Sequence, residues 1–218
     1  MKGVLPLKNG GISTHVIKRL PRYYRFLGDL SAAGIKKISS SELAEKMGLT
    51  ASQIRQDLNC FGGFGQQGYG YNTDILREEI GNILGVTAPK KIIIIGVGNL
   101  GRAIAQQMNF KDKGFNLIGL FDNKASIIGN VVRNVPIRNI DSLDDFCREN
   151  KPDAAILCIP RDAVKEIANH LVNLGVKGFL NFSHHDISLE HSGITVQNVH
   201  FGDNLMQLSY NIKNLEQD

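Results

Sequence analysis

The chain has only three cysteines, no tryptophan and no long apolar run. Cys60, Cys147 and Cys158 are widely spaced, and their spacing fits neither a disulfide framework nor a zinc site. No apolar stretch approaches the roughly 18 residues that a membrane helix needs, and the N-terminal residues lack the apolar core of a signal peptide. We therefore expect a cytoplasmic protein without a membrane segment and without a metal.

The positive charge is concentrated at one end of the chain. The 218 residues are 42% hydrophobic and 21% charged, which is typical of a globular protein with one or two domains. The net charge is only +4, but residues 1–58 hold ten basic and four acidic side chains, whereas residues 86–218 are neutral. A module that binds a polyanion needs such a concentration, although chance scatter in a small domain is the alternative.

A helix-turn-helix is predicted for residues 39–61. Capping-box patterns begin at Ser39 and at Thr50, and Gly48 lies between two short segments with apolar faces, where a tight turn is needed. The second helix is expected to run from about Thr50 to Phe61 and to turn polar side chains outward. The side chains that can bond to base edges or phosphates are Ser52, Gln53, Arg55, Gln56 and Asn59. A structural helical hairpin is the alternative, but the local positive charge favours DNA binding.

Segments on both sides of this motif complete a predicted winged-helix domain. A helix over residues 12–33 precedes it, and Pro21 is expected to start or kink that helix. Its apolar positions at helical spacing are Val16, Leu20, Tyr24, Leu27 and Leu30. Residues 61–71 interleave five glycines with aromatic side chains, which favours a small hairpin, the wing, over a flexible linker. A helix of about residues 74–84 closes the domain.

The second half of the chain alternates strand and helix signals. Strands are predicted at residues 91–96, 115–122, 154–160, 178–183 and 194–199, and helices near residues 99–110, 141–150 and 161–174. Continuous apolar strands separated by helices indicate an α/β fold with a doubly wound parallel sheet.

The sequence GVGNLG at residues 96–101 directly follows a predicted strand and opens a predicted helix. This is the context that a dinucleotide-binding GxGxxG requires, and Asp122 ends the next strand 21 residues after Gly101. We expect Gly96 to form the tight turn, Gly98 to admit the pyrophosphate and Gly101 to pack helix on strand. Asp122 is expected to bind the adenine ribose and to favour NAD over NADP. A doubly wound domain that binds no dinucleotide is the alternative.

An NAD-dependent oxidoreductase would also need a proton donor and a substrate domain. The pair His184-His185 follows a predicted strand at the ligand-binding edge and is the candidate by position. Residues 201–218 are too few for a substrate domain. They are predicted to form an amphipathic helix whose apolar stripe packs on its own domain or on a partner subunit.

Several motifs in this order resemble the Rex family of redox-sensing transcriptional repressors. They are ASQIRQDLNCFGGFGQQGYGYN, GVGNLGRA, the FD at residues 121–122, and GFLNFS. The likeness runs over about residues 15–210, and the pairing of a QIRxDL helix with a GxGNLG loop is specific. The resemblance implies a winged-helix domain, a Rossmann domain and a C-terminal helix exchanged between the subunits of a homodimer. It also implies a repressor without enzymatic activity that senses the NADH/NAD⁺ ratio and leaves palindromic operator DNA when NADH binds.

The resemblance also assigns residues to each task. Those assigned to DNA are Arg55 and Gln56 in the major groove, and Gln66, Gln67 and Tyr69 in the wing. Those assigned to the cofactor are Gly96, Val97, Gly98, Asn99, Leu100 and Gly101 at the pyrophosphate, Asp122 at the adenine ribose, and Ile159, Pro160, Asn181 and Phe182 near the nicotinamide. The expected domains are residues 1–85 for DNA, 86–200 for NAD(H) and 201–218 for dimerisation.

The chain departs from the family's pattern at several positions. Gln66-Gln67 stands where the family's wing usually carries Lys-Arg, and Gln56 replaces a frequent Lys. His200 stands where the family has an acidic residue that, in one conformational state, pairs across the dimer with the arginine matching Arg25. A histidine cannot make that pair. A DNA-binding repressor with a weakened or lost NADH response is therefore a further alternative.

Overall fold

The computed structural model describes residues 12–62 and 70–215 of the chain. It divides into two compact units, Met1–Thr87 and Ala88–Asp218. Each unit has its own buried core.

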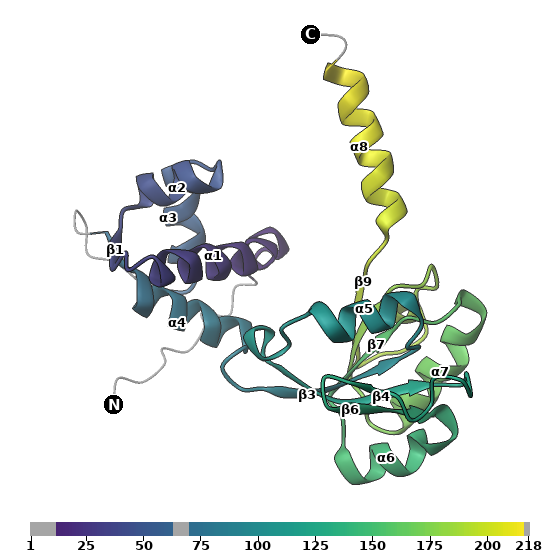
Figure 1. The fold of residues 1–218 in the computed structure, drawn as a ribbon. Helices are drawn as coiled ribbons and strands as arrows, with labels where there is room; N and C mark the ends of the chain where they lie inside the picture. Colours follow the sequence, from purple (N-terminus) through teal and green to yellow (C-terminus); the bar gives the residue numbers. More distant parts are fainter. Residues whose placement is uncertain (1–11, 63–69, 216–218) are drawn as a thin grey trace. The chain divides into compact units, whose positions relative to one another are not determined.

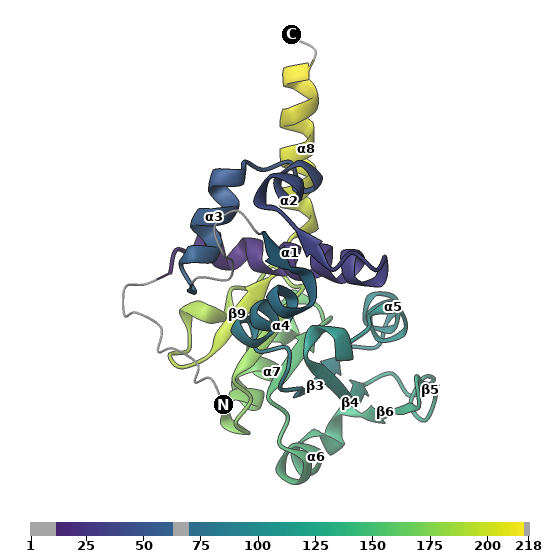
Figure 2. The ribbon, with the colours of Figure 1, turned by 90° about the vertical axis from the view of Figure 1, so that its left-hand side faces the viewer.

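In its described residues, the first unit is a helical bundle with one short pair of strands (Figures 1 and 2). Its elements are α1 (Thr14–Ala32), β1 (Lys37–Ile38), α2 (Ser40–Met47), α3 (Ala51–Asn59), β2 (Tyr71–Asn72) and α4 (Thr73–Leu84). Helix α1 packs on α4, α2 packs on α3, and β1 pairs with β2 in antiparallel register. The fully buried side chains of its core are Leu20, Tyr23, Leu27, Leu43, Met47, Ile54, Leu58, Leu76 and Ile80.

The helix-turn-helix expected from the sequence is present as α2 and α3. Ser39 and Glu42 form a reciprocal capping box at the start of α2, and Gly48 ends that helix in the left-handed conformation, with φ of +61°. Thr50 caps α3 by accepting a hydrogen bond from the backbone N–H of Gln53. Short-range patterns therefore decide where both helices begin and where the turn between them lies.

Several details of this unit differ from the expectation. Helix α1 runs through Pro21, so this residue does not start the helix. The buried aromatic residue of α1 is Tyr23, whereas Tyr24 is only half-buried, because the Tyr23 hydroxyl bonds to a buried carboxylate of α3. Helix α3 ends at Asn59, before Phe61. The expected wing residues Gln66, Gln67 and Tyr69 lie outside the described residues.

The second unit is a seven-stranded sheet flanked by helices (Figure 1). Its strands are β3 (Lys90–Ile95), β4 (Phe115–Asp122), β5 (Val131–Val132), β6 (Val135–Asn139), β7 (Ala154–Leu157), β8 (Gly178–Asn181) and β9 (Thr195–Asn198). Its α-helices are α5 (Asn99–Gln107), α6 (Leu143–Asn150), α7 (Arg161–Asn173) and α8 (Phe201–Leu215). Three short 3₁₀ turns occur at Lys111–Lys113, Ile140–Ser142 and Ile187–Leu189.

The strand order is β5-β6-β4-β3-β7-β8-β9, and all neighbours are parallel except β5 and β6. With the short edge strand β5 set aside, this is the order of a Rossmann sheet, whose direction of winding reverses between β3 and β7. The sequence patterns missed β6. This strand contains Pro136 and buries only Ile137, so it lacks the continuous apolar run of the other strands.

Alternate residues of β3 serve the two faces of the sheet. Ile93 and Ile95 belong to the core beneath α6 and α7, whereas Ile92 and Ile94 belong to the core beneath α5. Helix α8 behaves differently, because none of the residues 201–215 is buried.

The direction of winding reverses at the carboxyl end of β3. In a Rossmann fold this is the position at which a ligand binds.

Candidate nucleic-acid interface and dinucleotide site

Helix α3 presents the polar face that the sequence predicts. Four of the five expected side chains are exposed: Ser52, Arg55, Gln56 and Asn59. Gln53 is half-buried, and its side-chain amide donates to Asp57 rather than completing a capping box with Thr50. The Arg55 guanidinium donates to Ser40 Oγ on α2 over 3.0 Å. The opposite face of α3 is buried through Ile54 and Leu58, so only the polar face remains for a ligand.

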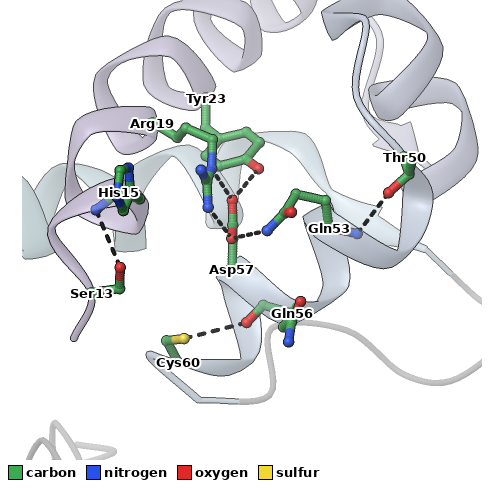
Figure 3. A network of polar contacts seen from close by, with 9 residues as sticks. All are labelled: Ser13, His15, Arg19, Tyr23, Thr50, Gln53, Gln56, Asp57 and Cys60. Carbon is green, nitrogen blue, oxygen red and sulfur yellow. Dashed lines mark hydrogen bonds and ion pairs between the residues drawn. The ribbon is translucent and has the colours of Figure 1, made fainter. Parts of the chain in front are cut away.

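A buried carboxylate anchors α3 to α1 (Figure 3). Asp57 is only 1% exposed. Arg19 of α1 bonds to it through two nitrogens, with Nε to Oδ2 at 2.6 Å and Nη2 to Oδ1 at 2.7 Å. The Tyr23 hydroxyl, also on α1, donates to Oδ2 over 2.7 Å, and Gln53 Nε2 donates to Oδ1 over 2.8 Å. Each carboxylate oxygen therefore accepts two hydrogen bonds.

Burial and these hydrogen bonds shift the pKa values of Asp57 and Tyr23. Burial by itself would raise the pKa of Asp57, but the hydrogen bonds from Arg19, Tyr23 and Gln53 and the Arg19 charge outweigh it and lower that pKa. The pKa of Tyr23 is raised, chiefly by burial and then by its bond to the carboxylate. Sequence reasoning missed this cluster, because Arg19 lies 38 residues before Asp57 and no local pattern joins them.

The glycines of the fingerprint loop have three different environments. Gly96 has φ of +88°, and a Cβ there would lie 2.5 Å from the carbonyl oxygen of Cys158. A Cβ on Gly101 would lie 1.9 Å from the Gly96 carbonyl oxygen. A Cβ on Gly98 would meet no atom within 4 Å. Gly96 and Gly101 are thus required by the fold itself, whereas the space beside Gly98 is open at the start of α5.

Asp122 closes the loop from the neighbouring strand β4. Its Oδ2 accepts from the backbone N–H of Val97 over 2.7 Å, and its Oδ1 accepts from that of Lys124 over 2.9 Å. Each carboxylate oxygen retains a further lone pair. Asp122 therefore joins the two strand ends beside α5, where a ribose that follows a pyrophosphate would lie.

The other predicted cofactor residues lie at the carboxyl ends of the next two strands. Cys158 follows β7 and donates its backbone N–H to the Ile95 carbonyl of β3, and Ile159 and Pro160 come next in the chain. Because β3, β4, β7 and β8 are adjacent and parallel, their carboxyl ends lie along one edge of the sheet. The structure therefore brings together the loop at 96–101 and the segments at 159–160 and 181–182.

Asn181 organises the loop after β8 from inside. It is fully buried, and its Nδ2 donates to the His185 carbonyl over 2.7 Å and to Asn198 Oδ1 over 2.9 Å. Its Oδ1 accepts from the backbone N–H and the hydroxyl of Ser183. Phe182 is half-buried, and its ring centroid lies 6.1 Å from that of Phe201, at the start of α8.

The adjacent histidines His184 and His185 contact different partners. His185 Nε2 lies 3.2 Å from Glu190, and the ring of His184 meets that of His200 edge to face at 5.3 Å between centroids. The two rings thus have different contacts among the described residues. Among residues 12–62 and 70–215, no group of three or more His, Cys, Asp or Glu side chains is placed to hold a metal ion. No helix in the same ranges is long and apolar enough to cross a membrane.

Comparison with known protein families identifies two segments. Residues 11–59 match a family described as putative DNA-binding protein N-terminus, and residues 87–185 match one described as CoA binding domain. The first segment contains α1, α2 and α3, and the second contains β3 to β8. The first matched segment thus contains the helix-turn-helix, and the second contains the fingerprint loop.

The chain is also similar to named transcriptional repressors over nearly its whole length. It is 49% identical to the redox-sensing transcriptional repressor Rex of Caldicellulosiruptor saccharolyticus, over 94% of this chain and 93% of the relative. It is 47% identical to the Rex repressor of Clostridioides difficile, over 95% and 98% respectively.

Two solved structures have the same fold throughout. One is RSP in complex with β-NAD⁺ and operator DNA, with a TM-score of 0.88, 46% identity and 96% coverage of both chains. The other is RSP in complex with β-NADH, with a TM-score of 0.85, 43% identity and coverage of 96% of this chain and 98% of that one.

Proposed function

Because the chain belongs to the Rex family of redox-sensing transcriptional repressors, we propose that it binds operator DNA and leaves it when NADH binds. One observation carries this proposal: a single chain joins the polar face of α3 to a fingerprint loop at the Rossmann switch point. The similarity to RSP structures with NAD⁺ and operator DNA, and with NADH, supports both halves. Such a repressor works in the cytoplasm.

DNA is assigned to the exposed face of α3. In a helix-turn-helix, the second helix lies in the major groove, and its N-terminal residues contact base edges. Arg55 and Gln56 are the side chains that we place on bases, while Ser52 and Asn59 flank them on the same exposed face. Gln66, Gln67 and Tyr69 are proposed to contact DNA from the wing.

The cofactor is assigned to the loop after β3. The open space beside Gly98 admits a phosphate close to the backbone, and the N-terminus of α5 supplies N–H donors and the positive end of its dipole. We assign Val97, Asn99 and Leu100 to the same cradle, and Asp122 to the adenine ribose. A carboxylate at that position would repel a 2′-phosphate, so NAD(H) is favoured over NADP(H).

Discrimination between the redox states is assigned to the nicotinamide end. The oxidised ring carries a positive charge, and an apolar, closed pocket disfavours a cation by desolvation. We place Ile159, Pro160, Asn181 and Phe182 near that ring. Closure on NADH would alter the spacing of the two DNA-binding units in a homodimer, and these units must lie about one helical turn apart on a palindrome.

Titration of operator-bound protein tests this function. Full-length protein on a fluorescent palindromic duplex, selected by the same protein from a random pool, is titrated with NADH and separately with NAD⁺. We expect NADH to release the DNA at concentrations at which NAD⁺ does not, and NADPH to be much weaker than NADH. To shift the ratio of the released to the DNA-bound conformation from 1:99 to 99:1, NADH would have to bind the released conformation more tightly by about 5.5 kcal/mol.

A repressor without a nucleotide response is the second candidate, because His200 stands where the family has an acidic residue. The ring of His200 meets that of His184, and its Nδ1 lies 4.0 Å from Asp203 of α8. In that case the duplex stays bound at any concentration of either dinucleotide. An oxidoreductase would instead consume NADH with a small carbonyl compound, and the His184→Ala substitution would stop that turnover.

A further inference from the structure

The amide of Gln53 has a fixed orientation. Asp57 is buried and its pKa is lowered, so its carboxylate is ionised and can only accept hydrogen bonds. The end of the Gln53 amide that faces it must therefore be the NH₂ group, as the 2.8 Å contact from Nε2 to Oδ1 shows (Figure 3). This leaves Oε1 and the second N–H of the amide uncommitted to Asp57.

The carboxylate is itself held in place from α1. Arg19 and Tyr23 supply three of the four hydrogen bonds to Asp57, and both side chains belong to a helix that packs in the core of the same unit. Gln53 supplies the fourth bond from the adjacent turn of α3. The orientation of its amide is thus set by α1 before any ligand arrives.

Gln53 also lies where base contacts are made. It is the third residue of α3, and its neighbours Ser52 and Gln56 are exposed. Among the described residues, neither Oε1 nor the second N–H of this amide has a hydrogen-bond partner. An acceptor beside an N–H donor on one amide matches N6 and N7 of adenine in the major groove, which glutamine contacts in a bidentate manner. A side chain already held in the bonding geometry loses less conformational entropy on binding.

We propose that Asp57 is a positioning residue for base readout, which, held by Arg19 and Tyr23, presents the Gln53 amide to an adenine. This role depends on the proposed operator binding and names a specificity determinant within it. Gln56 provides the contrast on the same helix, because its side-chain amide has no hydrogen-bond partner among the described residues.

The replacement Asp57→Asn tests the positioning without removing the Gln53 side chain. Asparagine keeps one oxygen, which the Nε of Arg19 and the Tyr23 hydroxyl retain, and its NH₂ group then takes the place of Oδ1, where the bonds from Arg19 Nη2 and Gln53 Nε2 are both lost. That group cannot accept from Gln53, so the Gln53 amide must turn its oxygen inward. Its outward pattern of donor and acceptor is lost.

The experiment compares affinities of full-length variants for related duplexes. The reference is the duplex that the wild-type protein selects from a random pool, and the competitors carry single base-pair replacements at each position of a half-site. We expect the affinity of the wild-type protein to fall when the A·T pair that Gln53 contacts is replaced. Gln53→Ala should reduce discrimination there about 10-fold, Asp57→Asn should do the same, and the double variant should show no further reduction.

Two controls separate positioning from general stability. Tyr23→Phe removes a donor to Oδ2 but leaves the bond between Gln53 and Oδ1, so it should lower stability and leave discrimination unchanged. Gln56→Ala removes an unanchored amide and should not change discrimination at the Gln53 position.

Certain results would overturn the proposal. One is a Gln53→Ala variant that discriminates as well as wild type at every A·T pair, which can be observed even if Asp57→Asn fails to fold. Another is an Asp57→Asn variant that weakens binding to all duplexes equally. If wild-type protein selects no duplex at all, operator binding itself fails, and the result is thereby distinguished from a failure of positioning alone.

Discussion

At the scale of single residues, Asp57 shows how a buried charge can be tolerated in a small helical unit. A carboxylate removed from water is costly unless its oxygens are bonded and its charge is paired. Here both oxygens are fully used, and Arg19, with 28% of its side chain exposed, balances the charge. The pair ties α3, the proposed DNA-binding helix, to α1.

Replacement of Asp57 by asparagine is expected to lower the stability of the first unit at pH 7 by about 3 kcal/mol, because Arg19 and Gln53 lose their common partner. The pKa of Asp57 is lowered in the folded state. Its stabilisation is therefore complete above the unfolded pKa of about 4 and is lost as the pH falls through the folded value. The difference between wild type and variant should shrink correspondingly in acid.

Hydrogen exchange of the α1 amides in the full-length protein measures this free energy. Asp74→Asn is the matched control, because Asp74 also pairs with a cation, Lys36, but remains 46% exposed. We expect a much smaller loss from that variant, since solvent screens an exposed pair. Equal losses in both variants, or a difference for Asp57→Asn that is independent of pH, would contradict the ion-pair explanation.

At the scale of elements, two glycines of the fingerprint loop differ in their surroundings. Packing within the protein leaves no room for a side chain at Gly101, whereas it leaves open space at Gly98. The carbonyl oxygen that crowds Gly101 belongs to Gly96, so the first turn of α5 packs against the loop itself. Gly98 carries no such constraint from the protein. Its lack of a side chain is what the proposed cofactor site would require, because a pyrophosphate there would approach the backbone closely.

Alanine substitutions at the two glycines should therefore behave differently. Gly98→Ala is expected to leave the melting temperature unchanged and to weaken NADH binding at least 10-fold, because the new methyl group occupies the space of the pyrophosphate. Gly101→Ala is expected to lower the melting temperature, because its Cβ would lie 1.9 Å from the Gly96 oxygen. Thermal unfolding and isothermal titration with NADH measure the two effects. A Gly98→Ala variant with normal NADH affinity would place the pyrophosphate elsewhere.

At the scale of the whole molecule, α8 is the one α-helix among the described residues that buries none of its side chains. Its apolar side chains are exposed, including Leu205 at 66% and Leu215 at 77%. Only its first residue, Phe201, has a ring contact within the described chain, with Phe182. An isolated helix of 15 residues is marginal in water. Of the two interpretations of its apolar stripe, packing on a partner subunit is the one that this exposure favours.

Charges placed on that stripe should disrupt a homodimer. Leu205→Glu combined with Ile212→Glu is expected to yield a monomer in sedimentation velocity, because both side chains lie on the same face of α8. The matched control, Gln207→Glu with Asn214→Glu, adds the same charge to the polar face and should leave the dimer intact. A wild-type protein that sediments as a monomer would contradict the proposed dimerisation through α8.

The sequence by itself determined the elements whose signals lie within a few residues. The capping pattern at Ser39, the turn at Gly48 and the fingerprint after β3 are each decided by neighbours along the chain. The alternation of apolar strands with helices likewise predicted most of the parallel sheet. The polar face of α3 followed from its helical period once the buried positions Ile54 and Leu58 were recognised.

Only the tertiary structure decided the features that join distant segments. The partners of Asp57, the place of β6 beside β4 and the separate contacts of His184 and His185 depend on residues brought together by folding. The exposure of α8 likewise emerges only when the rest of the core is complete. Local periodicity reports which face of an element is apolar, but the partner of that face is chosen by packing among all the elements, which no short window of sequence contains.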